Sequence, residues 1–189
     1  MAPAALIGGW TWAADRQPGD FSPVHETISA LAARGATDRW IMTTGLAALG
    51  ACHVVTALGL RPARRAGRLL LAAGGVATMV VAAAPQPEHG SSALHLAAAG
   101  AGFVTLSLWP VFATTSTTTA TGLPVPPVLR RRTGVAVSAV LLALLGWLAV
   151  EIGGGDLLGL SERLLAGAQS LWPLVVVLGL RGRAARMAP

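Results

Sequence analysis

Residues 40–60, WIMTTGLAALGACHVVTALGL, form the stretch that decides the fold. The stretch contains no Asp, Glu, Lys or Arg, and its ionisable side chains are Cys52 and His53. An α-helix of about 20 predominantly apolar residues is long enough to cross the hydrocarbon core of a bilayer. This stretch therefore predicts a membrane-spanning helix.

Further apolar blocks follow along the chain, and each of them predicts another span. They are Leu69–Ala84, Ala93–Ala113, Thr133–Ile152 and Leu164–Leu180. Met1–Ala14 is apolar but shorter, so we expect an incomplete first span there. Pro173 predicts a kink in the last block, because proline removes a helical hydrogen bond. The expected fold is all-α: a single transmembrane helix bundle over residues 1–189 with about six spans.

The composition supports a membrane protein over a soluble domain. Hydrophobic residues make up 53% of the chain and charged residues 12%, with a mean hydropathy of +0.63. Ordinary soluble domains carry about twice that share of charge. The net charge of +6 raises the question of nucleic-acid binding, but the basic residues stand at the ends of apolar blocks, where membrane topology explains them. We expect membrane lipid and a hydrophobic small molecule as partners, and no nucleic acid.

The charges also predict an orientation. The segments Arg61–Arg68, Arg130–Arg132 and Arg181–Arg186 hold four, three and three of the 14 basic residues and no Asp or Glu. With an even number of spans these segments share one side of the membrane, which the positive-inside rule assigns to the cytoplasm. The carboxyl terminus is therefore expected to be cytoplasmic. All eight acidic residues fall on the opposite, outer side.

The first outer loop contains most of the polar chemistry of the chain. It reads QPGDFSPVHETISALAARGATD over residues 17–38. Ser22 can cap a helix N-terminus, and Pro23 follows at the first helical position, where a missing N–H costs nothing. Gly35 is a typical helix stop. These signals predict a short surface helix over Pro23–Arg34.

Four outer residues are candidate catalytic acids or bases. Glu26 lies near the start of the expected surface helix, where simple solvation is the alternative explanation. His95 lies one turn inside a span, and ionisable groups at such depth usually face protein or water. Glu151 ends a span at the helix C-terminus, which disfavours an anion, so it needs a partner such as Arg39 or Arg163, or a catalytic role. Glu162 starts the last span, where Ser161 could cap the helix.

Candidate substrate-binding residues surround these acids and bases. They are His25, Ser29, Asp38 and Arg163. Ser29 lies four residues after His25, so an imidazole could activate its hydroxyl, although no nucleophile-elbow motif accompanies the pair. The His and acidic residues show no recognised metal-ligand spacing, so we predict no metal and no cofactor.

Several of these segments resemble one bacterial membrane family. The segments are PGDFSPVHETISALAARGATDRWIMTTGLAALGACHVV, the span ending at Pro85, His95 with the AAAGAGF that follows it, and SERLLAGAQSLW. Together they resemble the family of domain of unknown function 998, whose outer-loop motif is close to S-x-T-I-S-x-L. The resemblance implies a multispan protein of a bacterial inner membrane. It points to the segment from Glu26 to Leu31, to His95, and to Glu162 with Arg163, but implies no reaction.

Three functional hypotheses follow. The first is a non-catalytic protein that interacts with lipid or acts as a scaffold, with the polar residues ordering the outer loop. The second is a membrane-embedded enzyme that acts on a lipid or isoprenoid by acid/base chemistry, as a cyclase, isomerase or hydrolase. The third is a transporter, which is disfavoured because only His53 and the expected kink at Pro173 lie within the spans. We expect His53 to pack against a neighbouring helix.

Overall fold

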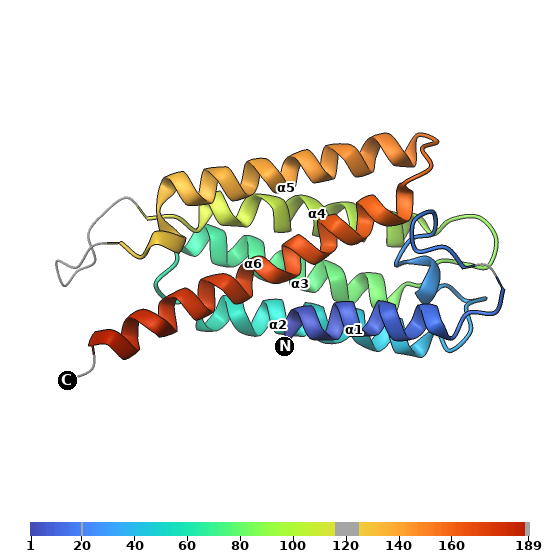
Figure 1. Ribbon diagram of the computed structural model, residues 1–189, viewed down its shortest axis with the longest axis horizontal. Helices are drawn as coiled ribbons and strands as arrows, with labels where there is room; N and C mark the ends of the chain where they lie inside the picture. Colours follow the sequence, from blue (N-terminus) through green and yellow to red (C-terminus); the bar gives the residue numbers. More distant parts are fainter. Residues whose placement is uncertain (20, 116–124, 188–189) are drawn as a thin grey trace.

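The computed structural model describes residues 1–19, 21–115 and 125–187, with side chains described up to residue 182. Asp20 and most of the Thr- and Pro-rich connector lie outside the described residues. The described part is helical and contains no strand. In chain order its elements are α1 (Ala2–Asp15), η1 (Ala30–Ala32), α2 (Trp40–Gly59), α3 (Arg65–Ala83), α4 (Ala93–Phe112), η2 (Pro127–Leu129), α5 (Arg131–Ile152) and α6 (Leu158–Met187), as Figure 1 shows.

The prediction of an all-α membrane bundle is confirmed. Five helices, α2 to α6, are long and apolar enough to cross a membrane. Helix α1 has 14 residues and is not among them. It packs on α2 and α6 in the half of the bundle nearest the first loop (Figure 1).

The helices form a closed ring. Each one from α1 to α6 packs against the next in the chain, and α6 returns to pack against α1. Successive helices run in opposite directions, so the connector with Glu88 and the start of α5 at Arg131 lie at opposite ends of the bundle (Figure 1). The described acidic residues lie at the same end as Glu88, which we call the acidic end. The predicted separation of acidic loops from the arginine-rich connectors is therefore present.

Helices α2 and α3 approach closely through two glycines. A Cβ atom on Gly50 would lie 2.5 Å from the carbonyl oxygen of Gly75, and one on Gly75 would lie 2.6 Å from that of Gly50. Both distances are too short for a real contact. Small residues at such points let membrane helices pack backbone against backbone. The glycine pair thus sets the spacing of the two helices around His53, whose Cβ lies 3.0 Å from a Cβ built on Gly75.

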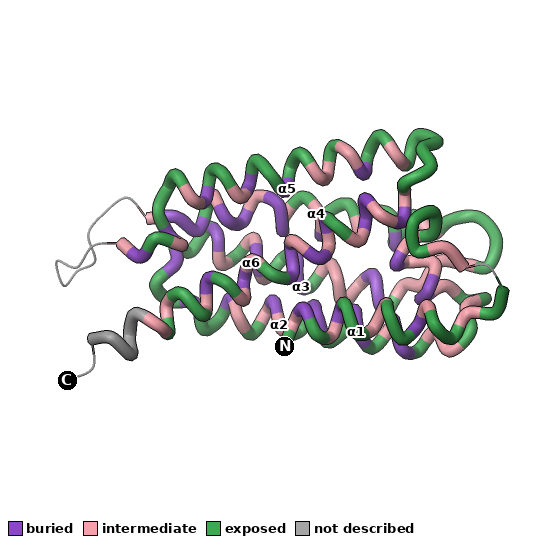
Figure 2. The backbone as a smooth tube through the Cα atoms, viewed as in Figure 1, coloured by how far each residue is buried: buried purple, intermediate pink, exposed green. Residues whose placement is uncertain are grey.

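Burial follows the ring (Figure 2). Buried residues face the inside of the bundle, while the outward face of α5 exposes large apolar side chains, among them Val140 and Val150. An apolar face of this kind is expected where a helix borders lipid. The bundle interior, by contrast, holds buried polar side chains on several helices.

The predicted surface helix over Pro23–Arg34 is wrong. The segment makes one turn after Ser22 and then only the short 3-10 helix η1. The backbone groups that would close a longer helix are bonded elsewhere: the Val24 carbonyl accepts from Leu160 of α6, and the Ile28 N–H donates to Glu162. Tertiary contacts with α6 therefore replace the local hydrogen bonds that the sequence signals favoured.

Helix α6 starts earlier than predicted, at Leu158 instead of Leu164. Ser161 consequently lies inside the helix, where its hydroxyl donates to the Leu158 carbonyl and caps nothing. Glu162 and Arg163 occupy the second turn of α6, facing the first loop, and do not mark its start.

Candidate functional site

The described part of the first loop, residues 16–19 and 21–39, is held across the acidic end of the bundle by backbone hydrogen bonds. The Leu160 N–H donates to the Val24 carbonyl at 3.0 Å. The Arg34 N–H donates to the carbonyl of Gln86, in the connector between α3 and α4, also at 3.0 Å. Because the loop is fixed to other elements at Val24 and at Arg34, the residues between them, including Ser29, have a defined position over the ring.

Glu162 projects from α6 beneath this loop. Its side chain is 7% exposed, and its carboxylate accepts a hydrogen bond from the Ile28 N–H. The other carboxylate oxygen, Oε1, lies 3.5 Å from the Ser29 hydroxyl. Glu162 is therefore a buried acid that contacts both the backbone and the hydroxyl of the first loop.

His95 of α4 contacts the same hydroxyl. It lies in the first turn of α4, where its N–H is capped by the Ser92 side chain, and it is 1% exposed. Its Nδ1 lies 2.8 Å from the Ala84 carbonyl oxygen, and its Nε2 lies 3.1 Å from the Ser29 hydroxyl. A carbonyl can only accept, so Nδ1 must carry a hydrogen. In the neutral imidazole Nε2 is then an acceptor aimed at Ser29.

These contacts form a chain that runs from the Ala84 carbonyl through His95 and Ser29 to Glu162. With a neutral imidazole, the Ser29 hydroxyl donates its hydrogen to His95 Nε2. The lone pairs of the Ser29 oxygen can then accept a hydrogen bond from Glu162, if the Glu162 carboxyl is protonated. With an imidazolium, Nε2 donates to Ser29, whose hydroxyl hydrogen turns to Glu162. The two arrangements differ by the transfer of one proton from Glu162 to His95 through Ser29. Ser29 is thus a hydroxyl with a base on one side and an acid on the other.

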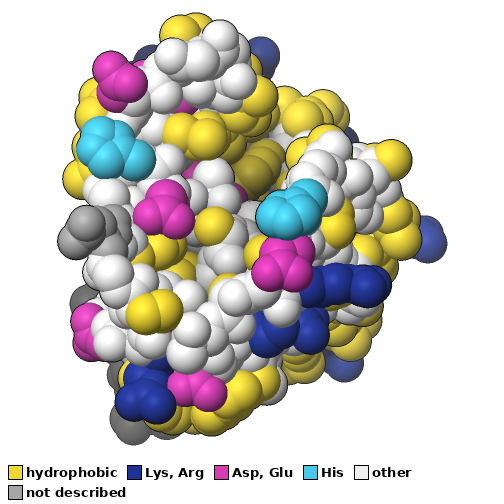
Figure 3. Space-filling model, turned by 90° about the vertical axis from the view of Figure 1, so that its right-hand side faces the viewer, with side chains coloured by type: hydrophobic (Ala, Val, Ile, Leu, Met, Phe, Trp, Pro, Cys, Tyr) yellow, Lys and Arg dark blue, Asp and Glu magenta, His cyan; other side chains and the backbone are white. Residues whose placement is uncertain are grey.

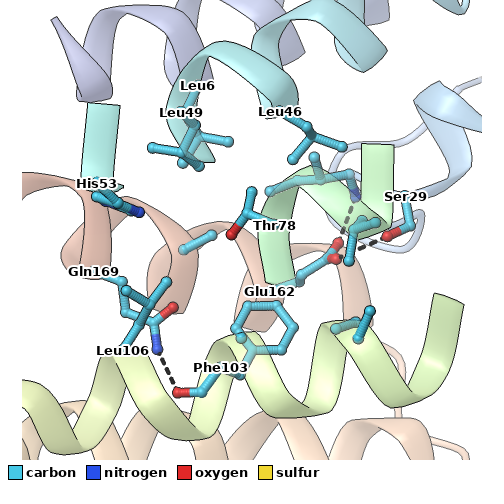
Figure 4. Close-up of a pocket in the computed structure, with 16 residues that line it drawn as sticks. Leu6, Ser29, Leu46, Leu49, His53, Thr78, Phe103, Leu106, Glu162 and Gln169 are labelled. Carbon is cyan, nitrogen blue, oxygen red and sulfur yellow. Dashed lines mark hydrogen bonds between the residues drawn. The ribbon is translucent and has the colours of Figure 1, made fainter. Parts of the chain in front are cut away.

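A cavity of about 60 Å³ begins at this chain and runs into the ring. Ser29 and Glu162 line one end of it, and most of its wall is apolar, with side chains such as Leu46 and Phe103 (Figure 4). Viewed from the acidic end, the surface is hollowed over a hydrophobic floor, with acidic and histidine side chains around the hollow (Figure 3). The apolar wall with a few convergent polar groups is the kind of lining that small-molecule sites have, at a volume smaller than the roughly 300–1,000 Å³ usual for them.

Comparison with known families identifies the chain. A family model described as protein of unknown function (DUF998) matches residues 1–179. The chain belongs to the DUF998 family. The comparisons with curated proteins and with solved structures gave no match. Membership of the DUF998 family thus confirms the resemblance seen in the sequence.

Two of the candidate residues in the first loop face away from the Ser29 chain. His25 is exposed, and its Nδ1 contacts the Asp156 carbonyl in the connector between α5 and α6. Glu26 is also exposed and accepts a hydrogen bond from the Ser22 N–H at 3.0 Å. The imidazole next to Ser29 is therefore His95, not the His25 that sequence spacing indicated. A role of His25 in substrate binding and of Glu26 in catalysis stays a prediction.

Glu151 has partners other than the arginines expected from its position. Its carboxylate accepts from the Trp147 indole N–H and from the Leu157 N–H, each at 2.8 Å. The expectation of Arg39 or Arg163 as its partner is wrong. The turn after α5 brings the Leu157 backbone to the carboxylate, which compensates for the unfavourable helix C-terminus.

Asp38 and Arg163 stabilise the conformation of the first loop through hydrogen bonds. Asp38 accepts from the Arg16 guanidinium at 2.8 Å, and this hydrogen bond holds the pKa of the Asp38 carboxyl below its ordinary value. Arg163 donates to the carbonyl oxygens of Pro23, Glu26 and Gly159. The site therefore brings together Ser29, His95 and Glu162 from the predicted set, with Arg163 fixing the loop beside them.

The interior of the cavity holds polar residues that sequence reasoning did not select. His53 and Gln169 line the end away from Ser29, and Thr78 lies between the two ends (Figure 4). Thr78 and Gln169 each stand in an apolar block, and a polar residue inside a span is a signal that could have found them. The described residues contain no group of three or more His, Cys, Asp or Glu that could hold a metal ion.

Proposed function

We propose that this DUF998 protein is a membrane-embedded enzyme that acts on a lipid by acid/base chemistry at Ser29, His95 and Glu162. The observation that carries the proposal is the Ser29 hydroxyl held 3.1 Å from His95 Nε2 at the end of an apolar cavity. A nucleophile within hydrogen-bond reach of a base that a third group orients is the usual arrangement of covalent catalysis. Here the third group is the Ala84 carbonyl.

The arrangement favours a hydrolase or acyl transferase over a cyclase or isomerase, because it activates a hydroxyl. Ser29 Oγ would attack the carbonyl carbon of a lipid ester while His95 Nε2 takes the hydroxyl proton. The imidazolium would then return that proton to the leaving alcohol oxygen. Water, or a second alcohol, would release the acyl group from Ser29 by the same two proton transfers.

Glu162 has a distinct part in this proposal. In the trypsin-like arrangement the acid holds the histidine, whereas here the acid faces the serine. An ionised carboxylate beside the attacking oxygen would oppose the negative charge that develops there. A protonated Glu162 would carry no charge, so it would not oppose the attack by Ser29 Oγ.

A non-catalytic role for the same contacts is the second candidate, and one observation favours it. The Glu162 carboxylate accepts from the Ile28 N–H, so it also anchors the first loop to α6. In that case the polar residues order the loop of a protein that interacts with lipid or acts as a scaffold. Chemical reactivity of Ser29 separates the two candidates.

Reaction of Ser29 with a long-chain alkyl fluorophosphonate tests the enzymatic proposal. This reagent bonds covalently to activated serine hydroxyls. In protein reconstituted into lipid vesicles we expect labelling of Ser29, detected by peptide mass spectrometry, and none in Ser29→Ala.

Glu26→Gln is the matched control, because Glu26 is exposed and lies three residues away. It should be labelled as fast as the wild type. Absence of Ser29 labelling in folded wild-type protein would remove the enzymatic proposal and leave the non-catalytic one.

We further propose that the protein lies in a bacterial inner membrane with the acidic end outward and the carboxyl terminus in the cytoplasm. The arginines of the connectors at the other end support this orientation. A reporter fused after Pro189 should show cytoplasmic activity, and one inserted between Gln86 and Ser92 should show external activity. The reverse pattern would place Ser29 near the cytoplasmic face and overturn the orientation.

A further inference from the structure

His53 occupies an unusual position deep in the bundle. Its side chain is 1% exposed, and neither ring nitrogen has a hydrogen-bond partner among the described residues. The ring comes from the middle of α2 and points into the cavity (Figure 4). Buried polar groups in proteins nearly always have a partner, so an imidazole left without one indicates a missing ligand or water.

Gln169 of α6 lies at the same end of the cavity (Figure 4). Its amide nitrogen donates to the Phe103 carbonyl at 2.9 Å and to the Ser107 hydroxyl at 3.0 Å. Because the Phe103 carbonyl can only accept, the amide orientation is determined, and the Gln169 carbonyl oxygen is turned away from it. That oxygen accepts no hydrogen bond from the residues that the structure describes.

The far end of the cavity carries no charge. Thr78, between the two ends of the cavity, is polar but uncharged, and its hydroxyl donates to the Gly74 carbonyl within α3 (Figure 4). Among the lining residues only Glu162 is acidic and none is Lys or Arg. Glu162 and Gln169 are seven residues apart on α6, which corresponds to about 10 Å along the helix. A charged group bound beside His53 would lack a counter-charge and would be costly to bury.

We propose that this end of the cavity, formed by His53 and Gln169, binds the hydroxyl group of an uncharged chain alcohol whose apolar chain leads past Thr78 toward Glu162. A hydroxyl can act as hydrogen-bond partner both to the His53 ring and to the Gln169 carbonyl oxygen. It accepts a hydrogen bond from the His53 N–H and donates one to the Gln169 carbonyl oxygen. The chain then contacts the apolar wall between His53 and Glu162. A plain hydrocarbon tail would leave the imidazole unpaired, so it fits this end poorly.

This binding site goes beyond the proposed function and does not require Ser29 to react. The probe is octanol with a photoreactive diazirine in its chain, applied to the wild-type protein in lipid vesicles. Illumination should label residues that line the cavity, identified by peptide mass spectrometry. The methyl ether of the same probe cannot donate a hydrogen bond, and we expect it to label these residues at least about tenfold less.

His53→Phe should reduce labelling of the cavity by the alcohol to the level of the ether. Cys52→Ala, next to it on α2 but outside the cavity lining, should leave that labelling unchanged. Equal labelling of the cavity by alcohol and ether, or labelling confined to the outward faces of the helices, would overturn the proposal. If His53→Phe does not fold, the comparison of alcohol and ether on the wild type still decides. The alcohol probe is attached by illumination and not by reaction with Ser29, which separates this result from a failure of the enzymatic proposal.

Discussion

Replacing His95 with Phe is expected to slow the reaction of Ser29 with the alkyl fluorophosphonate by about 10²- to 10⁴-fold, the usual contribution of a general base. His95 Nε2 is the imidazole nitrogen in contact with the Ser29 hydroxyl, at 3.1 Å. Phe fills a similar volume but cannot accept the hydroxyl proton. The measurement is the rate of covalent labelling of Ser29 in reconstituted protein.

His25→Phe is the matched control for this prediction, because His25 is four residues from Ser29 in sequence but its ring contacts the Asp156 carbonyl. It should change the labelling rate less than about twofold, since it removes no contact of the reacting hydroxyl. A slow reaction in His25→Phe together with a normal one in His95→Phe would show that the first loop adopts a different arrangement over the bundle. Unfolding curves of both variants must match that of the wild type.

Replacing Gly50 with Ala is expected to lower the free energy of unfolding by about 1–3 kcal/mol, the usual cost of overpacking a tight contact. The added methyl group would lie 2.5 Å from the Gly75 carbonyl oxygen and 2.7 Å from the Met79 Cγ atom. Helices α2 and α3 would have to separate, and His53 would move with α2. Denaturant titration in detergent, followed by helical circular dichroism, measures the change.

Gly146→Ala provides the comparison. Gly146 lies on the exposed face of α5, where an added Cβ has no neighbour within 4 Å. Ala is a better helix former than Gly, so this variant should be about 0.5–1 kcal/mol more stable than the wild type. If the two variants have equal stability, α2 and α3 do not pack backbone against backbone at Gly50.

The candidate site was predicted only in part. The sequence indicates His95 by its depth in a span, Ser29 by its spacing from His25, and Glu162 by its place at the expected start of the last span. Their grouping could not be predicted. Ser29 and His95 are 66 positions apart, and Ser29 and Glu162 are 133 apart. The short-range His25–Ser29 spacing indicated the wrong imidazole, since it assumed a helix that contacts with α6 prevent.

The direction in which a polar residue of a span faces could not be predicted from the sequence either. Gln169 stands in an apolar block, and the sequence alone does not tell whether it faces lipid, another helix or a cavity. The ring closure of α6 onto α1 turns its side chain toward α4, where the Phe103 carbonyl and Ser107 bond its amide. That ring closure, and the cavity inside it, depend on packing between helices that are distant in the chain.

The sequence by itself determined that the chain is a membrane bundle and that acidic and arginine-rich connectors lie at opposite ends. Both follow from local properties, since the length and apolarity of a block decide whether it spans a bilayer, and alternation of spans decides where each connector lies. Only the tertiary structure decided the path of the first loop, the meeting of Ser29 with His95 and Glu162, and the cavity that leads to His53. These features depend on packing and hydrogen bonds between segments that are distant in the chain. The hydropathy of each segment does not determine which segments meet.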